Sequence, residues 1–429
     1  MFSFDNAKSL ISTSGVICSA RKLLLLLLVF LAISEQYVSP AQTRGDNTGG
    51  INLKEIKPVT VYKQNQLADI SGDGKLLLFY QTRVPMRTYT IPLDGSPGYA
   101  NQPPVHDDVF RVVERESGRE VARLGIQDPS TTRFTPGTKK IIYKERTKAR
   151  PFGNESKIWD YQTGETKLCL NIKKSVYSPA FVDSNTAFGT VDDENKYLGS
   201  ILTKIDLTNC QTEVIGRIYP LDPNNRVRNN TIRGSGIKIS PDGKLMAYSL
   251  DSNDKIIFRN TAKPEQIVRE IDSAPLYFWS EQRFTPDGKF LITNAADGYM
   301  AYGGGVQENY YLLIYDMKSF RKVGQIVVPV NGQTTIPATA QIAVSPDSRL
   351  VAATYKTVKK GTWDNTEQAH VAIYDIASGK QVGKVSHPPL KEKRSDPFRS
   401  NISTIIFTPD GKHLLTSISD TYVWDVSNL

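Results

Sequence analysis

A short turn motif of the form Ser/Thr-Pro-Asp-Gly-Lys recurs along this chain of 429 residues and constrains its fold more than any other feature. Three copies are intact, one is a close variant and three are degenerate. In chain order the seven begin at Ser71, Thr135, Ser178, Ser240, Thr285, Ser345 and Thr408. A supersecondary unit repeated in this way predicts a fold assembled from similar units that pack on their neighbours.

Each unit is predicted to contain four antiparallel strands, named a to d. In the turn, Pro presets φ and Asp-Gly supplies a side-chain hydrogen bond and a positive φ, as a tight hairpin needs. A β-type run follows, as in Lys244 to Ser249, and later a second run ends in an aromatic and an acid, as in Val423-Trp424-Asp425. A further turn, such as Ala377-Ser378-Gly379-Lys380, opens the last strand.

The spacing of the units favours a β-propeller. Counted between the second positions of the turns, the steps are 64, 43, 62, 45, 60 and 63 residues. The compact steps match a four-stranded blade of about 40–45 residues, and the longer ones carry insertions. No Pro/Ser/Gly-rich linker separates the units, so independent domains fit less well. We predict an all-β, seven-bladed β-propeller of four-stranded antiparallel blades.

Ring closure is predicted from the two ends of the repeat region. The chain stops at Leu429, directly after the third strand of unit seven. A β-type stretch without a partner, Ile51 to Tyr62, precedes the first turn. We therefore expect this N-terminal strand to become the outer strand of blade seven and close the ring.

The segment from Phe407 to Val426 resembles the WD-repeat pattern, and the acid-turn-strand part resembles related bacterial (YVTN-type) propeller repeats. The resemblance spans nearly all of residues 51–429 and is strongest in units four to seven. It implies a propeller fold and a habit of binding partners, and it implies no reaction. No Gly-His pair precedes strand a, which leaves open whether the buried His–Ser–Trp–Asp network of WD repeats forms here.

The N-terminus has the layout of a secretory signal peptide. An apolar run at residues 23–33 follows Arg21 and Lys22, and Ser39-Pro40-Ala41 offers a cleavage site before Gln42. The run is short for a membrane-spanning helix, which needs about 20 residues. We expect residues 1–41 to be the signal, 42–50 a flexible lead-in and 51–429 the propeller. The protein would be exported, periplasmic or secreted, and attached to a membrane only if the signal stays uncleaved.

The composition excludes few classes of function. The formal charge is +9, but the charges are scattered, so we expect no nucleic-acid partner. Cys169 and Cys210 would survive cleavage, in blades two and three. Outer strands of neighbouring blades diverge, and a disulfide needs Cα atoms within about 7 Å. Two separate thiols are therefore favoured, with a disulfide left open.

Local catalytic motifs are absent from the sequence: there is no Gly-x-Ser-x-Gly, His-Glu-x-x-His, phosphate-binding loop or Cys-x-x-Cys. We accordingly predict no catalytic residue, no metal site and no cofactor. His370 and His413 are expected to be structural. His106, Asp107, Asp108 and His387 could converge for metal binding or acid–base chemistry, but exposed polar loop residues are the favoured interpretation.

Insertions mark the predicted binding face. They lie between strands b and c at Gln81 to Asp108, Ala296 to Asn309 and Lys356 to Ala369, and in the connection into blade seven, Ser386 to Ser400. These belong to blades one, five, six and seven, which adjoin in the ring, so their loops would form one rim. Aromatic and Arg side chains anchor interfaces. The predicted binding residues are Arg87, Tyr99, Tyr299, Tyr302, Trp363 and Arg394.

Two functions from different classes remain. The favoured one is an exported, monomeric, non-enzymatic propeller that binds a protein or glycan partner through this rim. The alternative is a propeller enzyme, lactonase-like or quinoprotein-like, whose residues converge at the central channel. A dry, apolar channel mouth would favour the scaffold, and a cluster of carboxylates and His would favour the enzyme.

Overall fold

The computed structural model describes fourteen stretches of the chain. They are residues 55–81, 108–126, 130–146, 154–168, 177–192, 200–218, 236–249, 255–272, 281–297, 309–328, 334–335, 340–359, 364–393 and 401–429. All belong to one compact unit, Leu53–Leu429. Within these stretches the chain forms strands and turns, and no helix.

The strands assemble into seven blades, numbered in chain order. Blade one contains β3 (Gln66–Ile70), β4 (Leu76–Gln81), β5 (Asp108–Glu114) and β6 (Glu120–Ile126). Blade two contains β7 (Ser130–Phe134), β8 (Lys140–Arg146), β9 (Asn154–Asp160) and β10 (Thr166–Leu168). Blade three contains β11 (Tyr177–Phe181), β12 (Thr186–Asp192), β13 (Ser200–Asp206) and β14 (Gln211–Arg217).

Blades four to seven follow the same plan. Blade four contains β15 (Lys238–Ile239), β16 (Leu245–Ser249), β17 (Lys255–Asn260) and β18 (Ile267–Asp272). Blade five contains β19 (Gln282–Phe284), β20 (Phe290–Asp297), β21 (Asn309–Asp316) and β22 (Arg321–Val328). Blade six contains β24 (Ile342–Val344), β25 (Leu350–Lys359), β26 (Asp364–Asp375) and β27 (Gln381–Ser386). Blade seven contains β29 (Thr404–Phe407), β30 (His413–Ser417), β31 (Thr421–Asp425) and β2 (Pro58–Tyr62).

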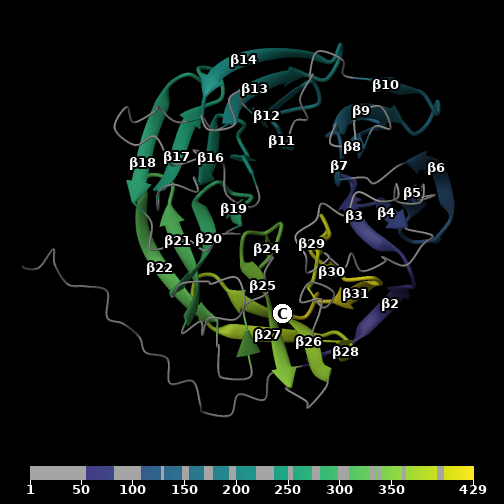
Figure 1. The fold of residues 1–429 in the computed structure, drawn as a ribbon. Coiled ribbons are helices and arrows are strands. Elements are labelled where there is room, and N and C mark those ends of the chain that lie inside the picture. The colour runs from purple at the N-terminus through teal and green to yellow at the C-terminus, as the bar shows by residue number, and fades with distance from the viewer. Residues whose placement is uncertain are drawn as a thin grey trace, which may run out of the picture. The chain divides into compact units, whose positions relative to one another are not determined.

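The blades form a closed ring around a central channel. The first strand of every blade lies innermost, as Figure 1 shows. Each inner strand contacts the inner strands of the two neighbouring blades, in the order β3, β7, β11, β15, β19, β24, β29 and back to β3. The predicted seven-bladed β-propeller is therefore confirmed.

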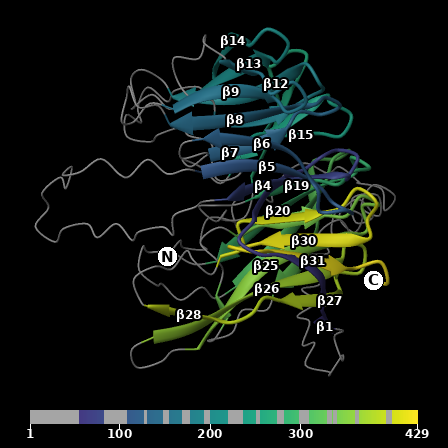
Figure 2. The ribbon, with the colours of Figure 1, turned by 90° about the vertical axis from the view of Figure 1, so that its right-hand side faces the viewer.

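The N-terminal segment closes the ring as predicted. β2 pairs antiparallel with β31 and supplies the outer strand of blade seven, with Val61 opposite Tyr422. A contact that the sequence did not predict precedes it, because β1 (Glu55–Ile56) pairs parallel with β27 of blade six. Figure 2 shows β1 beside β27, so this one segment joins two blades.

Hydrophobic clusters fill the seams between adjacent blades. Seven clusters occupy the seven seams, and each receives the last residue of one inner strand. These seven residues are Ile70, Phe134, Phe181, Ile239, Phe284, Val344 and Phe407. Because side chains alternate along a strand, the residue before each of them faces the other way. The side chain at this penultimate position therefore points toward the next seam or toward the channel.

The repeated turn works as its sequence predicts. In blade four, Ser240 Oγ donates to Asp242 Oδ1 at 2.6 Å, and the same Asp242 oxygen accepts from the Lys244 amide at 3.1 Å. Gly243 has a φ of 71°, which glycine adopts readily. The degenerate copy assigned to Ser178-Pro179 is wrong, because both residues lie inside β11. The blade-three turn lies just after it, where Asp183 Oδ1 accepts from the Thr186 amide at 2.8 Å.

A buried hydrogen-bond network in blade seven resembles part of the His–Ser–Trp–Asp network of WD repeats, although the sequence lacks the Gly-His pair. His387 Nε2 and Trp424 Nε1 each lie 2.8 Å from Thr416 Oγ1. His387 is 1% exposed and packs edge-on against Trp424. A histidine, a hydroxyl and a tryptophan thus come together although no glycine precedes the histidine.

Candidate functional site

The six predicted rim residues Arg87, Tyr99, Tyr299, Tyr302, Trp363 and Arg394 lie outside the described residues. Their proposed interface is therefore still a prediction. The described strands do show where their connections start. β4 ends at Gln81 and β5 begins at Asp108, so the blade-one insertion joins strands b and c as predicted.

The expected loop of blade six is a small sheet. β25 has ten residues and β26 twelve, whereas the b and c strands of other blades have five to eight. Two additional strands flank them: β23 (Thr334–Thr335) pairs with β25, and β28 (Leu390–Lys393) pairs with β26. Figure 2 shows β28 beside β26. We name residues 334–335, 356–359, 364–369 and 390–393 the blade-six extension. The predicted loops at Lys356 to Ala369 and after Ser386 are corrected accordingly.

Polar contacts fasten this extension to the ring. Lys356 Nζ lies 2.9 Å from Glu367 Oε2, and each side chain is 9% exposed. Gln368 Nε2 donates to the His387 carbonyl at 2.8 Å. Below the extension, His370 lies 3.0 Å from Thr357 Oγ1 and 2.9 Å from Ser386 Oγ. Because buried charged groups are costly unless paired, the Lys356–Glu367 pair holds β25 and β26 in one arrangement.

Charged side chains enter the central channel, and sequence reasoning missed them. The penultimate residue of the inner strand is charged in four blades and small or apolar in three. In ring order these residues are Asp69, Arg133, Ala180, Lys238, Arg283, Ala343 and Ile406. Glu281, directly before β19, adds a second carboxylate. We name Asp69, Arg133, Lys238, Glu281 and Arg283 the channel cluster.

The channel cluster links blades across the opening. Glu281 is 2% exposed, and one of its carboxylate oxygens accepts from Arg283 and lies 3.5 Å from Lys238 Nζ of blade four. Asp69 Oδ2 accepts from the Phe134 amide of blade two at 2.8 Å. Arg283 of blade five also lies within electrostatic reach of Asp69 and Arg133, on blades one and two. Such reach between distant blades places these groups in the channel.

The surroundings shift three of the cluster's pKa values. Burial lowers the pKa of Lys238 well below its usual value, and the neighbouring Arg283 lowers it further. Burial likewise lowers the pKa of Arg283, while burial raises the pKa of Asp69 although Arg133 opposes that shift. Each shift favours the neutral form of its group, as desolvation does. Perturbed pKa values of this kind gather at functional sites as well as in structural ion pairs.

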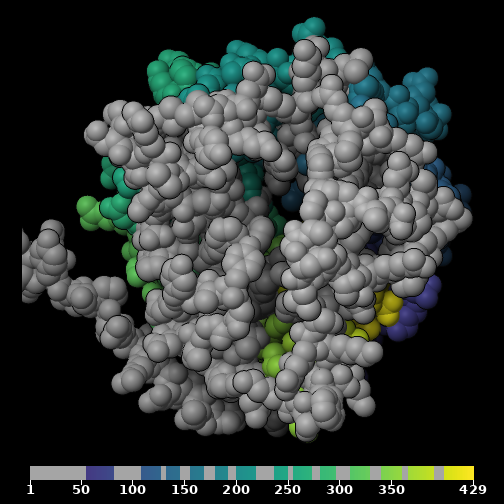
Figure 3. Space-filling model, viewed as in Figure 1, coloured from purple at the N-terminus to yellow at the C-terminus, as the bar shows by residue number. Residues whose placement is uncertain are grey.

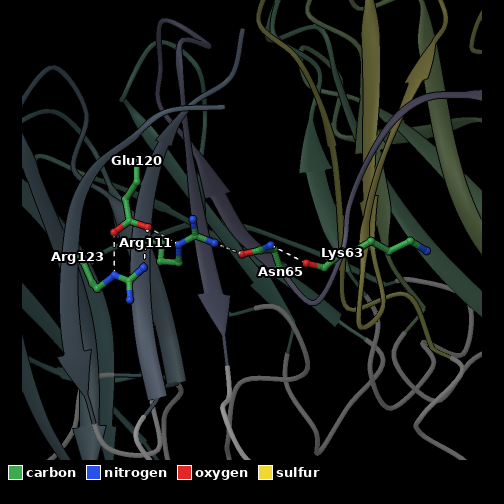
Figure 4. Close-up of polar contacts among 5 residues, drawn as sticks. All are labelled: Lys63, Asn65, Arg111, Glu120 and Arg123. Carbon is green, nitrogen blue, oxygen red and sulfur yellow. Dashed lines mark hydrogen bonds and ion pairs between the residues drawn. The ribbon is translucent and has the colours of Figure 1, made fainter. Parts of the chain in front are cut away.

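A second charged group, on blade one, is structural. Glu120 accepts from Arg123 Nε at 2.7 Å and from Arg111, and Arg111 donates to Asn65 at 2.8 Å (Figure 4). Asn65 in turn donates to the Lys63 carbonyl at 2.7 Å. The hydrogen bond from Arg123, strengthened by Arg111, lowers the pKa of Glu120 to about 2. Because each of these groups is partnered, the network ties the closing segment to blade one.

Two other expectations need correction. His387 is not an exposed loop residue, because it is buried at the seam of blades six and seven. His106 and Asp107 lie outside the described residues, and Asp108 is buried at the start of β5. Cys210 is disulfide-bonded, so two separate thiols were the wrong expectation for it. The chain's other cysteines, Cys18 and Cys169, lie outside the described residues.

Two further features are absent from the described stretches. Across them, no group of three or more His, Cys, Asp or Glu side chains is placed to hold a metal ion. None of their elements is a helix of the length and apolarity that crossing a membrane requires.

Comparison with known proteins supports the fold. No family model and no curated protein sequence matches this chain. The β-propeller domain of Cps50 (Swd1) from Myceliophteria thermophila is 12% identical, with 86% of this chain and 99% of that chain covered and a TM-score of 0.54. An oligogalacturonate lyase from Vibrio parahaemolyticus is 11% identical, with 89% and 95% covered and a TM-score of 0.52. At this identity the likeness establishes the propeller fold alone, and function must come from the site.

Proposed function

We propose that this chain is an exported, non-enzymatic β-propeller that binds a protein or glycan partner through the face bearing its b–c connections. The blade-six extension is the observation that carries the proposal. Among the described blades, it is a hydrogen-bonded platform in the place where the others have shorter strands. Functional residues concentrate on segments that a rigid scaffold holds in place, and the buried Lys356–Glu367 pair holds this one.

We also infer a place among WD-like propellers. His387 and Trp424 both contact Thr416, so a histidine, a tryptophan and a hydroxyl supply three of the four members of the WD-repeat network. The fourth, an acid, has a counterpart in Asp420, whose charge acts on His387 but which binds Lys63 and the Gln64 amide. A partner-binding role accords with that resemblance.

Export can be checked directly. Cleavage before Gln42 is predicted from the order of an Arg-Lys pair, a leucine-rich run and Ser-Pro-Ala. We expect mass spectrometry of the protein from the envelope or medium to find Gln42, or a near neighbour, as the first residue. Intact Met1 in a soluble cytoplasmic pool would refute export.

The binding face is tested at Trp363. This residue lies in the connection 360–363 of the sequence between β25 and β26, outside the described residues. Loss of a large aromatic anchor costs about 2 kcal/mol or more of binding free energy, and we predict that Trp363 acts as an anchor and not as a core residue. We expect Trp363→Ala to weaken partner capture from the envelope fraction at least about tenfold while the melting temperature stays nearly constant.

Val214→Ala is the matched control, because Val214 is 66% exposed on the outer strand of blade three. Figure 1 labels β14 at the edge of the ring, and teal atoms from this part of the chain are visible at the upper edge of the molecule in Figure 3. Capture by this variant should equal that of the unmodified protein. If Trp363→Ala unfolds the protein, Trp363 is a core residue. If capture is unchanged, blade six is not part of the interface.

A channel enzyme is the second candidate, and one observation favours it. Charged groups of four blades converge in the channel, and burial moves Asp69 and Lys238 toward their neutral forms, as acid–base catalysis requires. The channel cluster contains carboxylates but no histidine, whereas the enzyme hypothesis expects both. Turnover of a substrate that Lys238→Met abolishes would favour the enzyme over the scaffold.

A further inference from the structure

The penultimate positions of the inner strands carry two chemically different kinds of residue. At the penultimate positions, blades one, two, four and five present Asp69, Arg133, Lys238 and Arg283, whereas blades six and seven present Ala343 and Ile406. The seven positions are equivalent in the fold, so the charge is a property of the sequence and is not required by the propeller. Ala343 and Ile406 show that an apolar residue suits the position, because each packs into the next seam.

Cations exceed carboxylates in this cluster. Arg133, Lys238 and Arg283 face two carboxylates, and Glu281 already contacts both Lys238 and Arg283. If Asp69 and Lys238 both become neutral, the excess of one cation remains. A low-dielectric channel strengthens an uncompensated charge and concentrates ions of opposite sign.

Arg133 carries that excess. Its side chain is exposed, and among the described residues it makes no hydrogen bond or ion pair. Its charge nevertheless acts on Asp69, Lys238 and Arg283, which come from three other blades. Arg133 therefore lies within electrostatic reach of the inner strands of blades one, four and five, with its donors available to a ligand.

We propose that the central channel binds a small oxyanion, a carboxylate or a phosphate, with Arg133 as its principal contact and Arg283 as a supporting cation. The planar fork of a guanidinium matches both oxyanions through two parallel hydrogen bonds. The oxyanion is either a free ion or a group carried by an organic acid, and the two are separable by titration.

Titration calorimetry on the mature protein tests the site. Inorganic phosphate and citrate are titrated separately at constant ionic strength set with sodium chloride, and glucose serves as an uncharged probe. We expect saturable binding of at least one anion and none of glucose. Arg133→Ala should weaken that binding at least about tenfold, and Arg133→Lys, which keeps the charge but loses the fork, should fall between.

Arg321→Ala is the matched control, because Arg321 is an exposed arginine at the start of the outer strand β22. It should bind the anion as tightly as the unmodified protein. Equal binding by Arg133→Ala, or equal loss in both variants, would overturn the proposal. The site does not rest on the partner-binding face: Trp363→Ala should keep the anion, so failure of either proposal is visible without the other.

Discussion

A chain that begins at Lys63, and therefore lacks β1 and β2, should aggregate and should not persist as a folded monomer. Removal of β2 uncovers the edge of β31, and removal of β1 uncovers β27. An exposed strand edge offers unpaired amide and carbonyl groups to another chain. We expect size-exclusion chromatography to find most of the truncated protein in oligomers or in the void volume.

The free-energy cost supports that expectation. Ile56 is buried in the seam of blades six and seven, where Val61 also packs. The Tyr62 ring packs at a tilt against Phe79 with ring centroids 5.0 Å apart, and its hydroxyl donates to the Arg115 carbonyl at 3.0 Å. Burial of one such side chain contributes about 1.5–3 kcal/mol, so loss of all three costs on the order of 5 kcal/mol. A domain is stable by only about 5–15 kcal/mol in total.

A chain beginning at Leu53 is the control, because it keeps both strands and should remain monomeric. A synthetic peptide of residues 53–64, added in trans, should return part of the longer deletion to the monomer. A truncated protein that stays monodisperse, with the melting temperature of the control, would contradict the role of the closing segment.

Local chemistry explains why the architecture could be predicted. The Ser-Pro-Asp-Gly-Lys turn makes its contacts within five residues, as Ser240 and Asp242 show, so its pattern is visible in the sequence. Blade three shows the limit of such reasoning. Its turn uses Asp183 without the Pro and Gly, and the nearby Ser178-Pro179 misled the assignment.

Features made by contacts between blades could not be predicted in the same way. His387 is 29 residues from Thr416, and Lys238 is 43 residues from Glu281, so no local spacing announces either contact. The channel cluster did leave a signal. Arg133-Phe134-Thr135 and Arg283-Phe284-Thr285 place a cation at the same position of an inner strand, just before the turn. A charge at that position costs free energy unless it is paired or functional.

Two buried histidines, His370 in β26 and His387 just after β27, should make the propeller sensitive to acid. Burial, with a smaller contribution from Lys384, lowers the pKa of His370 to about 4. Burial also lowers the pKa of His387 to about 4, where His370 adds to the shift and Asp420 opposes it. Both rings are neutral in the folded protein at neutral pH, and their hydrogen bonds to hydroxyl groups need no charge.

The sign of the effect follows from proton binding. Between about pH 6.5 and pH 4 the unfolded chain binds protons at these histidines and the folded chain does not, so the free energy of unfolding falls as the pH falls. A shift from 6.5 to about 4 corresponds to about 3 kcal/mol for each histidine. Below pH 4 this contribution becomes constant. Asp410 and Glu120, whose pKa values are about 2, add their own losses in that lower range.

Urea unfolding at about pH 7 and about pH 4.5 should therefore show a loss of several kcal/mol in the unmodified protein. The double variant His370→Gln/His387→Asn removes both titrating rings and keeps polar side chains in their places. It should be less stable at pH 7, because buried hydrogen bonds are disturbed, yet lose much less between the two pH values. The change in the free energy of unfolding between the two pH values, compared between the two proteins, separates the effect of titration from that of disturbed packing. An equal loss in both proteins would show that carboxylates elsewhere, and not these two histidines, set the response to acid.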